Sequence, residues 1–225
     1  VPGGSRRMTN ETPTCFIAVH QGFASRYLLQ TDIVPTLLEQ GWRIVVLTPN
    51  ADSEPYFRET YGSDRLIVAP LNLTAAEAVR KTSRIHRFGS HVRSFVADRR
   101  KMLPQLDHFL DNHRRGRASL GRLSRLRFAI GDACIAVLRR SRFLRRLELD
   151  LENRFAGPDL HADLYRTYKP SMTVVTSPGN QGVDALLMRE ARRHGAKVAV
   201  VMINYDNSTT KGMRGGPIDG IAAWT

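Results

Sequence analysis

Polar side chains that could act on a substrate follow several apolar runs of this chain, at the points where those runs end. The ordinary pKa of a histidine lies near neutral pH, so His20 could remove a proton from a hydroxyl group. An aspartate could orient that histidine or serve as the base itself, and a lysine could neutralise a phosphate as a point charge. The residues of this kind are His20, Gln21, Asn50, Asp52, Ser177, Asn180, Asp206, Asn207, Thr209, Thr210 and Lys211.

Each of these residues also has an ordinary structural interpretation, which the sequence leaves open. His20 could be a hydrogen-bonded residue at a strand end, Asp206 could cap the turn that follows it, and Lys211 could simply be solvated. The segment 177–179 reads Ser-Pro-Gly and precedes a helical run, so its backbone N–H groups could favour an anion.

The motifs of several enzyme classes are missing from the sequence. There is no Gly-rich phosphate loop, and Gly22 after the first apolar run stands alone, which argues against a nicotinamide cofactor. No HExxH, paired Cys-x-x-Cys or His-Asp cluster points to a metal, and no Gly-x-Ser-x-Gly elbow is present. Cys15 and Cys134 are the two cysteines and lie far apart, so free thiols are expected.

The elements that would position these side chains follow the pattern of a parallel α/β sheet. Loops at the carboxyl ends of parallel strands lie side by side, so the polar residues are expected to meet at one edge of the sheet. We expect a Rossmann-like, mostly parallel sheet with helices on both faces and a long Arg-rich helical insert. The predicted strands are 16–19, 43–48, 65–69, 172–175 and 198–203, and the predicted helices outside the insert are 25–40, 159–168 and 183–194.

At 225 residues the chain is long enough to bury a full core. Residues 1–13 are expected to be a vector-derived remnant or disordered tail, and 14–225 a single Rossmann-like domain. The region 74–156 has no strand signal and predicts a helical insert of two or three long helices, broken near 112–116.

The net charge of +13 is concentrated in this insert. Residues 80–154 contain 20 lysines and arginines and 7 acidic residues, whereas the rest of the chain contains 14 of each. Such a patch should attract anions, namely phospholipid head groups, polyphosphate-linked substrates or nucleic acid. The plain alternative is an Arg-rich face in contact with solvent.

Apolar residues between 120 and 147 recur mostly every three or four positions, which predicts one helical stripe. A basic amphipathic helix of this type lies on anionic membrane surfaces, although the stripe could equally pack on its own domain. No apolar run approaches the ~18 residues of a membrane span, and no signal peptide is visible. We expect a cytoplasmic protein, peripheral at the inner membrane face, whose membrane or anion contacts are Arg139, Arg140, Arg142, Arg145 and Arg146.

The last quarter of the chain resembles a known family. It contains Thr176-Ser177-Pro178, a helix with Arg189-Glu190-Ala191, Gly195, a strand, and then Tyr205-Asp206-Asn207-x-Thr209-Thr210-Lys211-Gly212, followed by Asp219 and Trp224. This pattern resembles the N-terminal half of bacterial GT-B glycosyltransferases, in particular surface-polysaccharide enzymes and their CDP-glycerol glycerophosphotransferase-like relatives. Their loop often reads Trp-Asp-Asn-x-Thr-x-Lys-Gly, and here Tyr205 replaces the tryptophan. The resemblance covers residues 14–50 and 165–225.

This resemblance implies two Rossmann-like domains with the active site between them. The chain would correspond to the acceptor-binding domain, and the nucleotide-sugar donor would bind a C-terminal domain absent from these 225 residues, so the fragment alone should not turn over. No cofactor or metal is expected in this chain. The implied catalytic residues are His20 and Asp206, and the implied substrate-binding residues are Gln21, Ser177, Asn180, Asn207, Thr210 and Lys211.

The function implied is transfer of a sugar to a cell-surface polysaccharide or a lipid-linked acceptor. One alternative is a CDP-glycerol-type polyol-phosphate transferase with the same loop. Another is a basic module that binds polyanions or nucleic acid, although the insert has few aromatic residues and no known nucleic-acid motif. The oligomeric state stays open.

Overall fold

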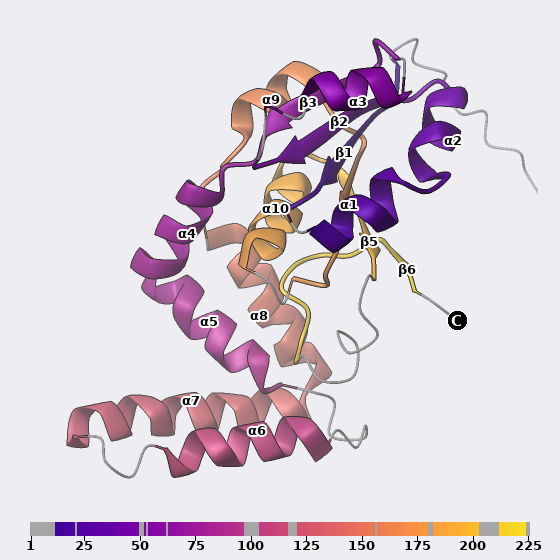
Figure 1. Cartoon of the computed structure of the whole chain (residues 1–225). Helices are drawn as coiled ribbons and strands as arrows, with labels where there is room; N and C mark the ends of the chain where they lie inside the picture. Colours follow the sequence, from indigo (N-terminus) through magenta and orange to yellow (C-terminus); the bar gives the residue numbers. More distant parts are fainter. Residues whose placement is uncertain are drawn as a thin grey trace, which may run out of the picture.

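One all-parallel sheet of six strands, in the order β3-β2-β1-β4-β5-β6, forms the centre of the computed structural model (Figure 1). The structure describes residues 12–20, 22–49, 52, 54–61, 63–96, 104–116, 121–155, 157–179, 182–202 and 212–223. The predicted α/β class with a Rossmann-like sheet is confirmed. The strands are β1 (Thr14–Ala18), β2 (Arg43–Thr48), β3 (Leu66–Pro70), β4 (Met172–Val175), β5 (Lys197–Val201) and β6 (Gly220–Ala222).

Helices connect each strand to the next from β1 to β5 and cover both faces of the sheet. Between β3 and β4 the described residues form six helices, and the first five of these form the helical insert. The helices are α1 (Gly22–Leu29), α2 (Ile33–Glu39), α3 (Glu54–Tyr61), α4 (Leu73–Thr82), α5 (Arg84–Ser94), α6 (Pro104–Arg115), α7 (Arg122–Arg140), α8 (Arg142–Phe155), α9 (Ala162–Tyr168) and α10 (Gly182–Arg193).

The side chains of β1 alternate between two hydrophobic cores, one on each face of the sheet. Phe16 packs on one face in a cluster that includes Tyr165 of α9 and Leu187 of α10. Ile17 packs on the other face in a cluster that includes Leu28 of α1. Successive residues of a strand point to opposite faces, so an unbroken apolar strand requires a cover on both sides.

The helix predicted over 25–40 is two helices instead of one. α1 ends at Leu29 and α2 begins at Ile33, after Asp32 as the N-cap residue. Pro35 lies in the first turn of α2, where its missing N–H costs nothing, but in a continuous helix its ring would clash with the carbonyl of Thr31. The proline therefore separates the two helices.

A glycine ends this helical run. Gly41 has a φ of +84°, its N–H bonds the carbonyl of Leu38, and the N–H of Trp42 bonds the carbonyl of Leu37. This pair of bonds is a Schellman motif, which satisfies the last carbonyls of α2 and turns the chain directly into β2.

The helical insert extends away from the sheet, with α6 and α7 side by side at its far end (Figure 1). It has a small core of its own, formed by Val92 of α5, Leu110 of α6, and Ile135 and Leu138 of α7. Across the described parts of the chain, no helix is long and apolar enough to cross a membrane.

The stripe predicted over 120–147 is divided between two helices. α7 ends at Arg140, Ser141 has extended backbone angles, and its Oγ accepts a hydrogen bond from the N–H of Leu144 at 3.2 Å. Ser141 is thus the N-cap of α8, and a capping serine within an arginine-rich run is the sequence signal for the break.

A buried ionic network attaches the insert to the rest of the domain. Glu152 of α8 accepts from Arg189 of α10 at 2.6 Å and also pairs with Arg93 of α5. Burial is the main factor that lowers the pKa of each arginine to about 10, so both stay charged at neutral pH. Removing one partner from such a network costs about 3–5 kcal/mol, because a buried charge is left uncompensated.

Candidate functional site

A histidine, an aspartate and a serine meet at the carboxyl edge of the sheet. His20 follows β1 and Ser177 follows β4, and these two strands are hydrogen-bonded neighbours. Asp184 lies in the first turn of α10, directly after the loop that Ser177 begins. The chain runs outward from β1 on one side and from β4 on the other, so this edge is the topological switch point, where open α/β sheets bind ligands.

The carboxylate of Asp184 is fully buried and accepts two hydrogen bonds. His20 Nε2 lies 2.9 Å from its Oδ1, and Ser177 Oγ donates to its Oδ2 at 2.6 Å. The N-terminal turn of a helix also favours a negative charge, so the position suits an ionised carboxylate.

This arrangement fixes the orientation of the His20 ring. A carboxylate can only accept, so Nε2 carries the proton that is donated to Asp184, and Nδ1 is the nitrogen that could accept another proton. Within the described residues, Nδ1 of His20 has no hydrogen-bond partner. The geometry is that of a histidine base oriented by an aspartate.

Asp184 was not among the candidates taken from the sequence. The role of orienting a histidine was considered for Asp206, which lies outside the described residues. An acidic residue in the first turn of a helix that follows a strand-end loop was the available signal. It was weak, because acidic residues are common at that position in any helix.

Several other predicted residues also lie outside the part of the chain that the structure describes. The structure therefore brings together His20 and Ser177 from the sequence-predicted set and adds Asp184. Asp52 is described and exposed beyond β2. The residues outside the described ranges are Gln21, Asn50, Asn180, Asp206, Asn207, Thr209, Thr210 and Lys211.

The segment after residue 211 is fixed tightly against the serine loop. The N–H of Gly215 donates to the carbonyl of Pro178 at 2.8 Å, and Arg189 Nε donates to the carbonyl of Gly215 at 2.9 Å. A Cβ on Gly215 would lie 2.3 Å from the carbonyl oxygen of Gly179, so only glycine permits this approach.

The five arginines predicted as anion contacts separate into two groups. Arg139 Nε donates to the carbonyl of Phe95 at 2.8 Å and Arg139 Nη1 pairs with Asp107 at 2.6 Å, which ties this side chain into the insert. Arg139 and Arg140 line one cavity between α6 and α7. Arg142, Arg145 and Arg146 line a different cavity, at the carboxyl edge of the sheet.

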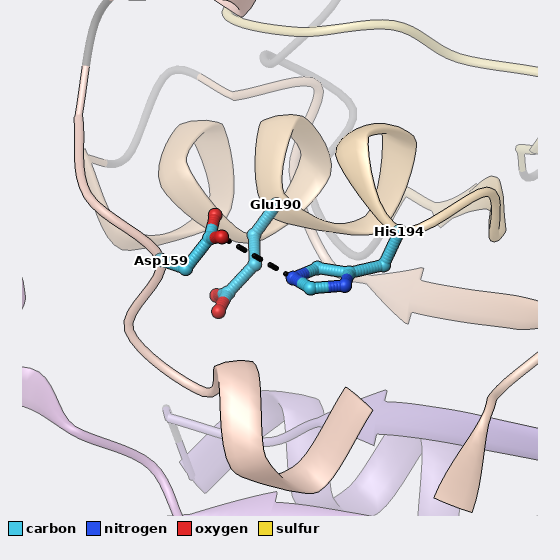
Figure 2. Close-up of side chains that lie close together, drawn as sticks. All are labelled: Asp159, Glu190 and His194. Carbon is cyan, nitrogen blue, oxygen red and sulfur yellow. Dashed lines mark ion pairs between the residues drawn. The ribbon is translucent and has the colours of Figure 1, made fainter. Parts of the chain in front are cut away.

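Asp159, Glu190 and His194 form the group whose ligand atoms come close enough for a metal within the described ranges (Figure 2). Arg193 Nε donates to Asp159 at 2.7 Å, and this positive charge opposes a cation. Glu190 accepts from the backbone N–H and from Nδ1 of His161. Asp159 and Glu190 therefore have protein partners already, and the cluster has a structural role.

His161 is held on both ring nitrogens. The backbone N–H of Asn72 donates to Nε2 at 3.1 Å, so the ring proton lies on Nδ1 and is donated to Glu190 at 3.1 Å. The pair connects α10, α9 and the start of α4.

No protein-family model matches this chain, and neither does any curated protein or solved structure. The fold and the geometry of its side chains are therefore the observations on which a function can be argued.

Proposed function

We propose that this domain binds the acceptor in a GT-B-type glycosyltransferase that transfers a sugar from a nucleotide-sugar to a surface-polysaccharide or lipid-linked acceptor. The observation that carries the proposal is the His20–Asp184 pair at the switch point of a parallel sheet, 2.9 Å apart. The resemblance of residues 14–50 and 165–225 to the N-terminal half of such enzymes supports it.

In this proposal His20 is the general base. Its Nδ1 takes the proton of the acceptor hydroxyl while that oxygen forms a bond to the anomeric carbon of the donor. The bond between the anomeric carbon and the nucleoside diphosphate breaks, and the diphosphate leaves. Asp184 holds the ring and stabilises the imidazolium that forms, and Ser177 fixes the carboxylate. The donor binds another domain of the whole protein.

The test is a donor and acceptor screen with the whole natural protein, followed by His20→Ala and Asp184→Asn. We expect His20→Ala to lower kcat by roughly 10²–10⁴-fold with little change in KM, because general-base catalysis contributes about that much. A His20→Ala variant that keeps more than a tenth of the wild-type kcat would exclude His20 as the base. Turnover of CDP-glycerol without turnover of nucleotide-sugars would assign the polyol-phosphate alternative instead.

A membrane role for the insert is favoured by a separate observation. The structure has 14 exposed large hydrophobic side chains among its described residues, and 11 of them lie between 84 and 155. Several line an apolar groove of about 650 Å³ between α5, α7 and α8, including Phe88, Val137, Leu147 and Leu151. Exposed apolar patches of this extent mark interaction sites.

The positive charge of the insert favours an anionic partner for that groove. Residues 80–154 carry a net charge of +13, which complements an anionic lipid surface, and the exposed apolar side chains would enter the acyl boundary. We infer that the insert holds the domain on an anionic membrane.

Flotation with phosphatidylcholine vesicles, with and without phosphatidylglycerol, tests this inference. We expect Leu147→Gln/Leu151→Gln to weaken binding to the anionic vesicles at least tenfold. The control is Phe23→Gln on α1, whose side chain is more exposed (63%, against 42% for Leu147 and 50% for Leu151) but lies outside the insert, and it should bind as the wild type does. Absence of vesicle binding, or a stable dimer that buries the groove, would exclude the membrane role.

A further inference from the structure

A second cavity, of about 530 Å³, lies between α8 and the carboxyl edge of the sheet. Its floor is formed by residues that follow three neighbouring strands: Pro178 after β4, Met202 after β5, and Ile221 and Ala223 at β6. Small-molecule sites typically occupy about 300–1,000 Å³ and lie at this edge of an α/β sheet. Pro178 directly follows Ser177, which donates to Asp184, so one loop contributes both to the cavity and to the His20–Asp184 site.

Four arginines line this cavity, and none of its described lining residues is acidic. They are Arg142, Arg145 and Arg146 of α8, and Arg214 from the segment before β6. The cavity between α6 and α7 also contains arginines, but there Asp107 and Asp111 accompany them. The apolar groove contains Glu148 and Glu152 and no arginine. Of these three cavities, this one therefore has the chemistry of an anion site.

The position of these arginines is unfavourable for the helix that carries them. Arg142, Arg145 and Arg146 follow the N-cap of α8, and the first turn of α8 contains no acidic residue. The N-terminus of a helix is its positive end, so cations there are unfavourable where an acidic residue would be stabilising. A bound anion would reverse that balance.

Two of the arginines have no competing role. Arg145 Nη1 donates to the carbonyls of Leu138 and Arg139 at 2.8 and 3.2 Å, which completes the end of α7. Arg146 and Arg214 are exposed and form no ion pair with any residue that the structure describes. Guanidinium groups are suited to phosphate because they donate two parallel hydrogen bonds to its oxygens.

We propose that this cavity binds a phosphate or pyrophosphate group, with Arg146 and Arg214 as its principal ligands. The ligand class is a phosphate-bearing molecule, which includes both a phosphorylated acceptor and a phospholipid head group. The proposal rests on the proposed function in one respect, because the phosphate would anchor the acceptor on the edge of the sheet that carries His20.

Titration of the chain with inorganic pyrophosphate, followed by calorimetry at about 0.15 M salt to screen diffuse charge, tests the site directly. We expect saturable one-to-one binding that Arg146→Gln/Arg214→Gln weakens at least tenfold. The matched control, Arg122→Gln/Arg125→Gln on α7, removes the same charge outside the cavity and should change the affinity less than twofold. No saturable binding, or equal weakening in the two double variants, would overturn the proposal.

Two further arms separate the sources of the phosphate. If Arg146→Gln/Arg214→Gln loses pyrophosphate but still floats with anionic vesicles, the site takes a phosphorylated acceptor. If it loses both, and pyrophosphate displaces the wild type from vesicles, the site takes a lipid head group. His20→Ala should bind pyrophosphate as the wild type does, so the phosphate site can stand even if the general-base function fails.

Discussion

Two carboxylates of α10, Asp184 and Glu190, each pair with a histidine, and the two histidines differ in how many of their ring nitrogens are hydrogen-bonded. His161 uses both ring nitrogens, one on Glu190 and one on the backbone of Asn72, and is buried. His20 uses one nitrogen on Asp184, and within the described residues the other has no partner. A histidine beside a carboxylate therefore suggests a catalytic role only where one of its ring nitrogens has no hydrogen-bond partner.

Removing each histidine in turn should show this difference most clearly. His161→Ala leaves Oε2 of the buried Glu190 and the backbone N–H of Asn72 without their partners and removes a buried ring, so we expect a loss of about 4 kcal/mol in the free energy of unfolding. His20→Ala should cost about 2 kcal/mol, because Ser177 still donates to the buried Asp184 and no backbone N–H loses its partner. Urea unfolding of both variants measures the difference, and equal losses would make His20 as structural as His161.

A third histidine, His86, also contacts α10, and it should make the stability of the fold depend on pH. His86 is buried beside Arg189 without a carboxylate, and burial, followed by the charges of Arg189, Arg93 and Arg80, lowers its pKa from 6.5 to about 4. The unfolded state therefore binds a proton at a higher pH than the folded state does. Stability from this group is complete above pH 6.5 and is lost as the pH falls toward 4.

The expected loss from His86 is up to about 3 kcal/mol between these pH values. His86→Leu cannot titrate, so its unfolding free energy should fall less steeply over the same range. If the unfolding free energies of the wild type and His86→Leu fall in parallel with pH, the pKa of His86 is not lowered in the folded protein.

The smallest expected loss of stability is that of Asn72→Ala, because the side chain and the backbone N–H of Asn72 have different roles. Asn72 caps α4 with its Oδ1, which accepts from the N–H of Ala75 at 3.0 Å, while its backbone N–H holds His161. Asn72→Ala removes the cap alone and should cost about 1 kcal/mol by urea unfolding. A loss as large as that of His161→Ala would mean that the backbone contact is also broken.

The sequence was sufficient for five of the six strands, because these are short apolar runs with clear ends, whereas the three exposed residues of β6 give no such signal. β2 and β4 lie at the predicted residues. The helical insert was harder to divide, since the apolar spacing continues across Ser141 while the cap interrupts the backbone. The position of the break between α7 and α8 depends on the hydrogen bond of one serine, which the apolar periodicity does not show.

The candidate site was only partly predictable for a different reason. A strand-end position predicts where His20 and Ser177 lie, because parallel strands align their carboxyl ends. The partner of His20 is 164 residues away along the chain. No local pattern can show that Asp184 rather than another carboxylate reaches it, since that depends on how α10 is set against β1.

The pairing of β1 with β4 also sets an order of events during synthesis. Cys15 pairs with Met172, so one edge of β1 has no native neighbour until about 100 residues beyond β3 have been made. At roughly 5–20 residues per second the ribosome needs about 5–20 s for that stretch. Throughout that interval the nascent chain carries an open, apolar strand edge, a known route to aggregation. The length of the helical insert is therefore also the length of time for which the growing chain must be protected.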